Sequence, residues 1–172
     1  MKYSIQLLNT IFFLSLLTLS ISCGSAKCND KLIVKDCPPD GKCSVTIHKN
    51  KSLFVKTDDL GKLLYELQDN ANKDIAVYTY DRTPPKDVMD GSYREEVIVE
   101  LDKGQQTIVL SGGLSKSGTK VLFGRFCYCK GFTGYYKIAS GNLTALDESV
   151  YSVDFKVTEV PQILEKIQFS IK

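Results

Sequence analysis

Cysteines are the residues of this 172-residue chain best suited to chemistry, and there are six of them. Two lie near the N-terminus, two flank a loop rich in proline, and two are separated by a single tyrosine. An exported chain meets an oxidising compartment, where paired thiols become disulfides. The expected disulfide cysteines are Cys37, Cys43, Cys127 and Cys129.

The pairing among these four cysteines is not determined by the sequence. The ends of the 37–43 loop could be joined to each other. In a strand, however, the side chains of Cys127 and Cys129 project on the same face, so a bond between those two is expected to be strained. The favoured arrangement therefore joins Cys37 and Cys43 to Cys127 and Cys129, which would fasten the N-terminal loop to a central strand. Cys28 is then the unpaired thiol.

A cysteine-based metal or redox module is the alternative for the same four residues, with His48 as a further ligand. The spacings Cys-x5-Cys and Cys-x-Cys differ from the Cys-x2-Cys pairs of structural zinc sites and of thioredoxin-like redox motifs. Disulfides are therefore favoured, and no metal or cofactor is expected. His48 lies in an alternating segment and is expected on the surface of a strand.

Catalytic motifs are absent from the sequence, so no catalytic residue is expected. The chain has one histidine, which lies in no nucleophile-like context. The neighbouring carboxylates Glu95 and Glu96 would point to opposite faces of a strand, which makes them poor acid–base partners. A secreted enzyme whose carboxylates converge from distant positions remains a second alternative.

Aromatic and basic residues alternate most densely over residues 123–137. Tyrosine and arginine are enriched where proteins bind their partners, and aromatic faces stack on sugars and peptide groups. A sheet with one buried and one solvated face would show the same pattern. The candidate binding patch comprises Arg125, Lys130, Tyr135 and Lys137 around the turn at 131–134.

The N-terminus has the parts of an export signal. Lys2 is followed by an apolar run over residues 5–19, shorter than a spanning helix, and then by Ser20, Ile21, Ser22 and Cys23. This arrangement resembles a bacterial lipoprotein signal peptide, in its looser Bacteroidetes-type form because Ser20 stands where an aliphatic residue is usual. The resemblance implies cleavage before Cys23 and acylation of Cys23, for example by palmitate. The alternative is ordinary secretion.

These features define an expected domain organisation and location. Residues 1–22 form the signal peptide, 23–30 a lipidated tether, and 31–172 a single β-rich domain. The protein is expected to be an outer-membrane lipoprotein that faces the periplasm or the cell exterior. Removal of Lys2 leaves 21 basic and 20 acidic side chains. That balance excludes the basic footprint of a nucleic-acid-binding protein.

Short alternating segments separated by turn residues dominate the rest of the chain. They include 31–35, 43–48, 53–56, 75–80, 93–101, 106–110, 119–130, 133–139 and 150–157. Residues 58–68 have both helical and strand periodicity. The β surroundings favour a hairpin that turns at 69–72 into the segment 75–80. A turn at 102–104 predicts a second hairpin. Gly124 indicates a β-bulge. Residues 162–166 are expected to form one helical turn. The expected fold is an all-β antiparallel sandwich, or a barrel-like domain, with little helix.

The block from Leu122 to Tyr136, together with residues 158–163, resembles a group of small uncharacterised lipoproteins of flavobacteria-like bacteria. The resemblance covers most of the chain after Cys23 and implies a membrane anchor and one small β domain. It transfers no activity. The expected function is therefore that of a non-enzymatic binding or accessory module, whose partner is an envelope protein or a glycan.

Overall fold

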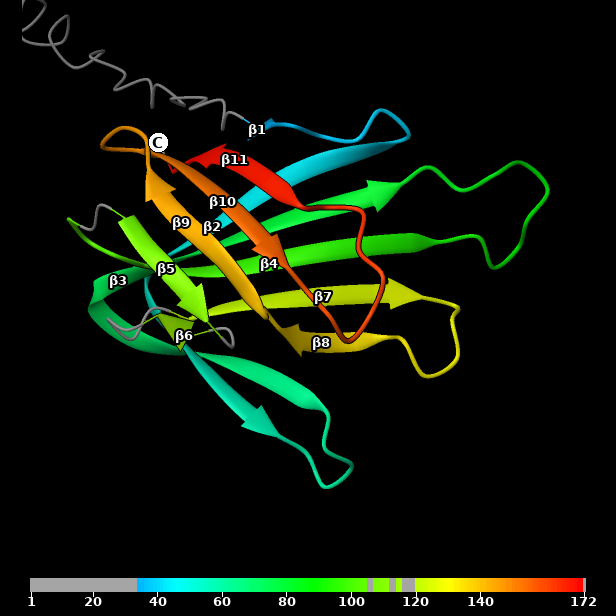
Figure 1. The fold of residues 1–172 in the computed structure, drawn as a ribbon, viewed down its shortest axis with the longest axis horizontal. Coiled ribbons are helices and arrows are strands. Elements are labelled where there is room, and N and C mark those ends of the chain that lie inside the picture. The colour runs from blue at the N-terminus through cyan, green and yellow to red at the C-terminus, as the bar shows by residue number, and fades with distance from the viewer. Residues whose placement is uncertain (1–33, 105–106, 112–113, 116–119, 172) are drawn as a thin grey trace, which may run out of the picture. The chain divides into compact units, whose positions relative to one another are not determined.

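The structure is a computed structural model that describes residues 34–104, 107–111, 114–115 and 120–171 (Figure 1). Residues from Lys31 to Lys172 form one compact unit. The signal peptide, the tether, Cys23 and Cys28 lie outside the described residues, so their assignments stay predictions.

The described residues form strands and contain no helix, which confirms the expected all-β class. It follows that this part of the chain has no helix long and apolar enough to cross a membrane. The strands are β1 (Val34–Lys35), β2 (Gly41–Thr57), β3 (Leu63–Arg82), β4 (Tyr93–Asp102), β5 (Thr107–Ser111), β6 (Leu114–Ser115), β7 (Val121–Cys127), β8 (Gly134–Lys137), β9 (Ser140–Ala145), β10 (Val150–Lys156) and β11 (Lys166–Ser170).

Two antiparallel sheets build the domain (Figure 1). One has the order β1-β11-β10-β9-β5-β6 and the other the order β2-β3-β4-β7-β8. Alternate side chains of both sheets meet in one apolar core, which includes Tyr78, Val97, Phe123, Val153 and Phe169. A sheet that buries one face alternates apolar and polar residues, and this explains why the predicted alternating segments coincide with strands. The 43–48 and 53–56 segments belong to the single strand β2, and β6 and β9 lie in none of the predicted segments.

The longest elements, β2 and β3, form a bent hairpin whose register shifts between Lys49 and Lys51. Before the shift, Val45 faces the core between the sheets; after it, Leu53 faces a second apolar cluster on the opposite side. Asn50, with φ of 56°, is the one residue of β2 between the two paired stretches and lies across from residues 70–73 of β3. The side-chain alternation of β2 reverses at Asn50. Asparagine tolerates this left-handed conformation better than most residues.

The second cluster lies on the other face of the five-stranded sheet. Its buried members are Leu53, Ile75, Ile98 and Leu122, with one residue from each of four strands. The bent hairpin also pairs with the last strand of the sheet, because Leu63 of β3 lies opposite Tyr135 of β8. The hairpin therefore covers apolar side chains that a flat sheet would leave exposed to water.

A buried carboxylate fastens the bend of this hairpin to β4. Glu100 is fully buried; its carboxylate accepts a hydrogen bond from the backbone N–H of Leu53 at 2.6 Å and from Nζ of Lys73 at 2.5 Å. Burial alone would lower the pKa of Lys73, but hydrogen bonds and charge from Glu100 and Asp102 raise it overall. Nζ of Lys120 donates to the carbonyl of Leu53 at 2.6 Å, so both backbone groups of Leu53 are paired to residues outside β2.

Several local predictions are wrong. Residues 69–72 are not a turn but the irregular centre of β3, and 162–166 form no helical turn. The 93–101 and 106–110 segments do not form a hairpin, because β4 pairs with β3 and β7 whereas β5 crosses to the other sheet. Gly124 is not a bulge, since the β4–β7 register is continuous there. A Cβ at Gly124 would lie 2.9 Å from the rings of Phe126 and Tyr135, so close packing is what requires glycine.

The Glu100 contact gives a first prediction. Glu100→Ala leaves the Leu53 N–H and the Lys73 ammonium without their buried acceptor, and is expected to lower the free energy of unfolding by about 3 kcal/mol. Glu66→Ala is the matched control, because it removes an exposed ion pair with Lys56 on the same hairpin. Its effect is expected to stay below about 1 kcal/mol. Urea unfolding measures both, and equal effects would contradict the role given to Glu100.

Candidate binding surface

Both disulfides of the described domain are local. Cys37 is bonded to Cys43, with Cα atoms 5.7 Å apart, and Cys127 to Cys129, with Cα atoms 5.2 Å apart. The identity of the four disulfide cysteines is as expected, but the predicted connection between the two pairs is wrong.

The sheet order explains why the two pairs cannot be joined. Cys43 lies opposite Tyr80, Tyr80 opposite Glu95, and Glu95 opposite Arg125. Three strand spacings therefore separate Cys43 from the segment that carries Cys127, a distance of about 14 Å. A disulfide needs Cα atoms within about 7 Å of each other.

The Cys37–Cys43 loop is held by more than its disulfide. Asp40 in this loop accepts a hydrogen bond from the hydroxyl of Tyr80 at 2.7 Å and forms an ion pair with Arg82 at 2.9 Å. The hydrogen bond from Tyr80 is the largest cause that lowers the pKa of Asp40; Arg82 adds a smaller contribution in the same direction, and burial opposes both. Burial and the Asp40 contact raise the pKa of Tyr80. These contacts place the start of β2 beside the end of β3.

Two adjoining pockets lie where β3 and β7 end and β4 begins. One, of about 480 Å³, is lined by residues 127–131 and Thr133 of the β7–β8 loop. The other, of about 400 Å³, is lined by Asp81, Arg82, Pro84, Ser92, Tyr93, Arg94, Phe126, Cys127 and Thr133. Cys127 and Thr133 belong to both pockets. We call this end of the five-stranded sheet, with its two pockets, the loop-end surface.

Arginine side chains stack on aromatic rings on both faces of the sheet near the loop-end surface. The guanidinium of Arg94 lies 5.0 Å from the ring centre of Phe126, and that of Arg125 lies 5.4 Å from the ring centre of Tyr93. Arg94 also forms an ion pair with Glu96 at 3.3 Å. Stacked guanidinium groups keep their edges available for hydrogen bonds to carboxylates, phosphates or sugar hydroxyls.

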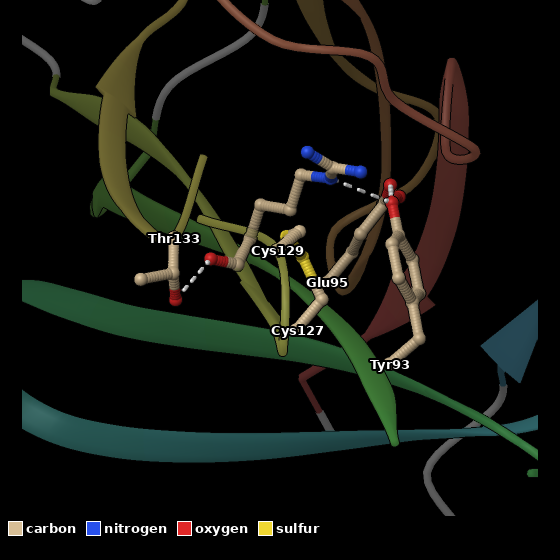
Figure 2. The surroundings of a disulfide bond; sticks show 6 residues. Tyr93, Glu95, Cys127, Cys129 and Thr133 are labelled. Carbon is tan, nitrogen blue, oxygen red and sulfur yellow. Dashed lines mark hydrogen bonds between the residues drawn. A yellow bond between two sulfur atoms is a disulfide. The ribbon is translucent and has the colours of Figure 1, made fainter. Parts of the chain in front are cut away.

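Glu95 lies behind this surface and is fully buried (Figure 2). Its carboxylate accepts hydrogen bonds from the backbone N–H groups of Ile163 and Leu164, both at 2.7 Å, and from the hydroxyl of Tyr93. Nε of Arg125 donates to the same hydroxyl at 3.3 Å. Burial raises the pKa of Glu95, and the hydrogen bonds and Arg125 partly oppose that increase. Because its carboxylate already holds the 157–165 loop, Glu95 has a structural role here.

The four residues of the predicted binding patch are not brought together on one face. Arg125 is half-buried on the inner face of β7, next to Tyr93. Tyr135 lies on the opposite face, where its hydroxyl donates to Glu96 at 3.2 Å and its ring packs edge-on against Tyr65 and Phe126. Lys130 is exposed in the β7–β8 loop and lines the 480 Å³ pocket, whereas Lys137 is exposed on β8. Of the four, only Lys130 lines either pocket.

Several residues of the loop-end surface were not predicted: Arg82, Tyr93, Arg94, Phe126 and Thr133. They lie at the end of β3, the start of β4, the end of β7 and in the β7–β8 loop, and their convergence depends on sheet order. Glu95 did carry a sequence signal, because a carboxylate at an inward position of an alternating strand must find buried partners. The opposite orientation of Glu95 and Glu96 is as expected.

The metal alternative finds no ligand set within the described part of the chain, where no group of three or more His, Cys, Asp or Glu side chains could hold an ion. All four candidate cysteines are bonded to each other in pairs. His48 is half-buried on β2, opposite Ile75.

The fold and surface define the protein as a two-sheet, all-β domain with a pocketed loop end. No protein-family model matches the chain, and no curated protein and no solved structure is similar enough to be matched.

The buried carboxylate gives a second prediction, with a defined pH dependence. Glu95→Gln replaces one acceptor oxygen by an NH2 group, which cannot accept from a backbone N–H, and is expected to lower the free energy of unfolding by about 1–3 kcal/mol. Because the folded-state pKa of Glu95 is raised, its titration favours the folded state at low pH and loses that effect as pH rises through the folded-state pKa.

The stability difference between wild type and Glu95→Gln is therefore expected to be largest below the unfolded-state pKa of about 4.5 and to shrink towards neutral pH. Urea unfolding at a series of pH values measures it. A stability difference that grows with pH would show that the pKa of Glu95 is not raised in the folded state.

Proposed function

We propose that this protein is a membrane-anchored envelope lipoprotein, and that its β domain is a non-enzymatic binding or accessory module. The observation that carries the binding role is the loop-end surface, where two pockets meet at Cys127 and Thr133. The lipid anchor at Cys23 rests on the sequence of the export signal.

The chemistry of the loop-end surface suits recognition. Tyr93 and Phe126 offer apolar faces, and Arg82 and Arg94 offer donors on half-exposed side chains. Exposed apolar side chains at the tips of the neighbouring loops, Met89 at 101% and Tyr128 at 83% exposure, extend the surface outward. Aromatic and arginine residues together are the commonest source of binding energy at protein interfaces. A protein or a glycan of the cell envelope is the partner that we propose.

Site-specific photo-crosslinking in intact cells tests the binding role. A photoreactive amino acid at Thr133, in the wall shared by both pockets, is expected to form a discrete adduct with a peptide or glycan, identified by its mass. The matched control is position Leu146, which is 54% exposed in the β9–β10 turn, away from the loop-end surface in Figure 1. No adduct at position 133, or equal adducts at both positions, would exclude this surface as the binding site.

The anchor is tested separately by metabolic labelling with an alkyne-bearing palmitate analogue. The wild-type chain is expected to incorporate the label, and Cys23→Ala to lose it and leave the membrane fraction. Several acyl chains on one cysteine would make the anchor effectively permanent, since each buried methylene contributes about 0.8 kcal/mol. Undiminished labelling of Cys23→Ala would rule out the lipoprotein assignment while leaving the binding test unaffected.

A further inference from the structure

The two disulfides differ in their surroundings. Cys37 and Cys43 pack against the apolar core between the sheets. Cys127 and Cys129 instead line the 480 Å³ pocket, together with Lys130 and Thr133. In Figure 2, Cys127 and Cys129 lie between Thr133 on one side and Tyr93 and Glu95 on the other. All four cysteines are partly exposed, but only Cys127 and Cys129 line this pocket. Thiol–disulfide exchange requires that an incoming thiolate reach a sulfur atom, and the pocket offers such a thiolate a place beside the second disulfide.

The loop that carries Cys129 has hydrogen bonds that do not depend on the disulfide. The N–H of Phe132 donates to the carbonyl of Cys129 at 3.1 Å, and Oγ1 of Thr133 donates to the carbonyl of Arg125 at 3.2 Å. Strand pairing holds Cys127 opposite Tyr93. When the S–S bond opens, these contacts are expected to keep the two Cα atoms near their present separation of 5.2 Å. That separation lies within the range for a disulfide, so the bond can form again without a refolding step.

The disulfide also contributes little to the stability of the fold. It closes a loop with a sequence separation of only two residues. The chain entropy that a disulfide removes from the unfolded state grows with loop length, so this one lies at the low end of the range. Opening it is therefore compatible with a folded domain.

A basic residue lies close in sequence to each of the two cysteines. Arg125 lies two residues before Cys127 and on the same face of β7, and Lys130 follows Cys129 and lines the same pocket. Cationic side chains near a cysteine favour its thiolate form, which makes the cysteine a better leaving group in exchange.

We propose that Cys127–Cys129 is a thiol–disulfide exchange site for the dithiol of a partner protein. A partner thiolate attacks one of the two sulfur atoms, a mixed disulfide forms, and the other cysteine leaves as a thiolate that takes up a proton. The second partner thiol then loses its proton and attacks the mixed disulfide. This step forms the partner's disulfide and releases the remaining cysteine as a thiolate, which is then protonated.

The partner loses two electrons and two protons, and the Cys127–Cys129 pair gains them. The reverse steps pass the electrons to the disulfide of another protein and restore the bond. This activity goes beyond the proposed binding role and does not depend on it.

The test uses the full mature chain in oxygen-free glutathione buffers of graded composition. Thiols are trapped by acid and alkylated, the remaining disulfides are then reduced and labelled with a heavy alkylator, and each cysteine peptide is quantified by mass spectrometry. Cys127–Cys129 is expected to be half-reduced at a ratio of [GSH]² to [GSSG] at least about tenfold lower than Cys37–Cys43 requires. Equal ratios, or a more resistant Cys127–Cys129, would overturn the proposal.

A kinetic measurement addresses the mixed-disulfide step. Cys129→Ser leaves a single thiol at Cys127, and Cys43→Ser leaves one at Cys37 as the matched control. With oxidised glutathione as the probe, Cys127 is expected to form its mixed disulfide at least about tenfold faster than Cys37. Peptide mapping separates these thiols from Cys28. A faster reaction at Cys37 than at Cys127 would exclude an exchange site at Cys127–Cys129. The glutathione titration uses the wild-type chain, so it tests the proposal even if a variant fails to fold.

Discussion

The reversal of side-chain alternation at Asn50 is the constraint on which the five-stranded sheet depends. A strand has only two faces, so a regular β2 would keep Leu53 on the same face as Val45. The reversal at Asn50 places Leu53 in the second apolar cluster, and the bent hairpin brings Leu63 opposite Tyr135. One sheet can thereby bury both of its faces: one against the second sheet and the other against its own bent hairpin.

Strand β4 fixes this arrangement with carboxylates on both of its faces. Glu95 points between the sheets and holds the backbone of Ile163 and Leu164, whereas Glu100 points to the other side and holds the backbone of Leu53. Each carboxylate accepts hydrogen bonds from backbone N–H groups that do not donate to a neighbouring strand. Buried carboxylates are expensive unless every oxygen is paired, so both residues specify a single arrangement of the segments that they bind.

The disulfides have a different role from the strand pairing and the two buried glutamates. Sheet pairing and the two buried glutamates already connect distant segments of the chain, so no disulfide is needed to join Cys43 to β7. The disulfides act on single loops instead. Cys37–Cys43 shapes the entry to β2 beside Asp40, and Cys127–Cys129 shapes the wall of a pocket. This leaves one disulfide at a surface where it can react, without making the fold dependent on it.

The fold class and most of the strands can be predicted from the sequence, because alternation with a period of two reflects a local property of each segment. Val150–Lys156 and Val121–Cys127 were predicted in this way, as was the opposite orientation of Glu95 and Glu96. The four disulfide cysteines can be predicted because paired thiols of an exported chain become oxidised. Which segments become neighbours follows from the order of strands in the folded sheets, and alternation carries no information about that order. Alternation shows that Thr107–Ser111 is a strand but not that it joins the other sheet, and it cannot show that three strand spacings separate Cys43 from β7. The loop-end surface depends on those neighbours, since its residues come from strands that are distant in sequence and meet only through the order of the sheet.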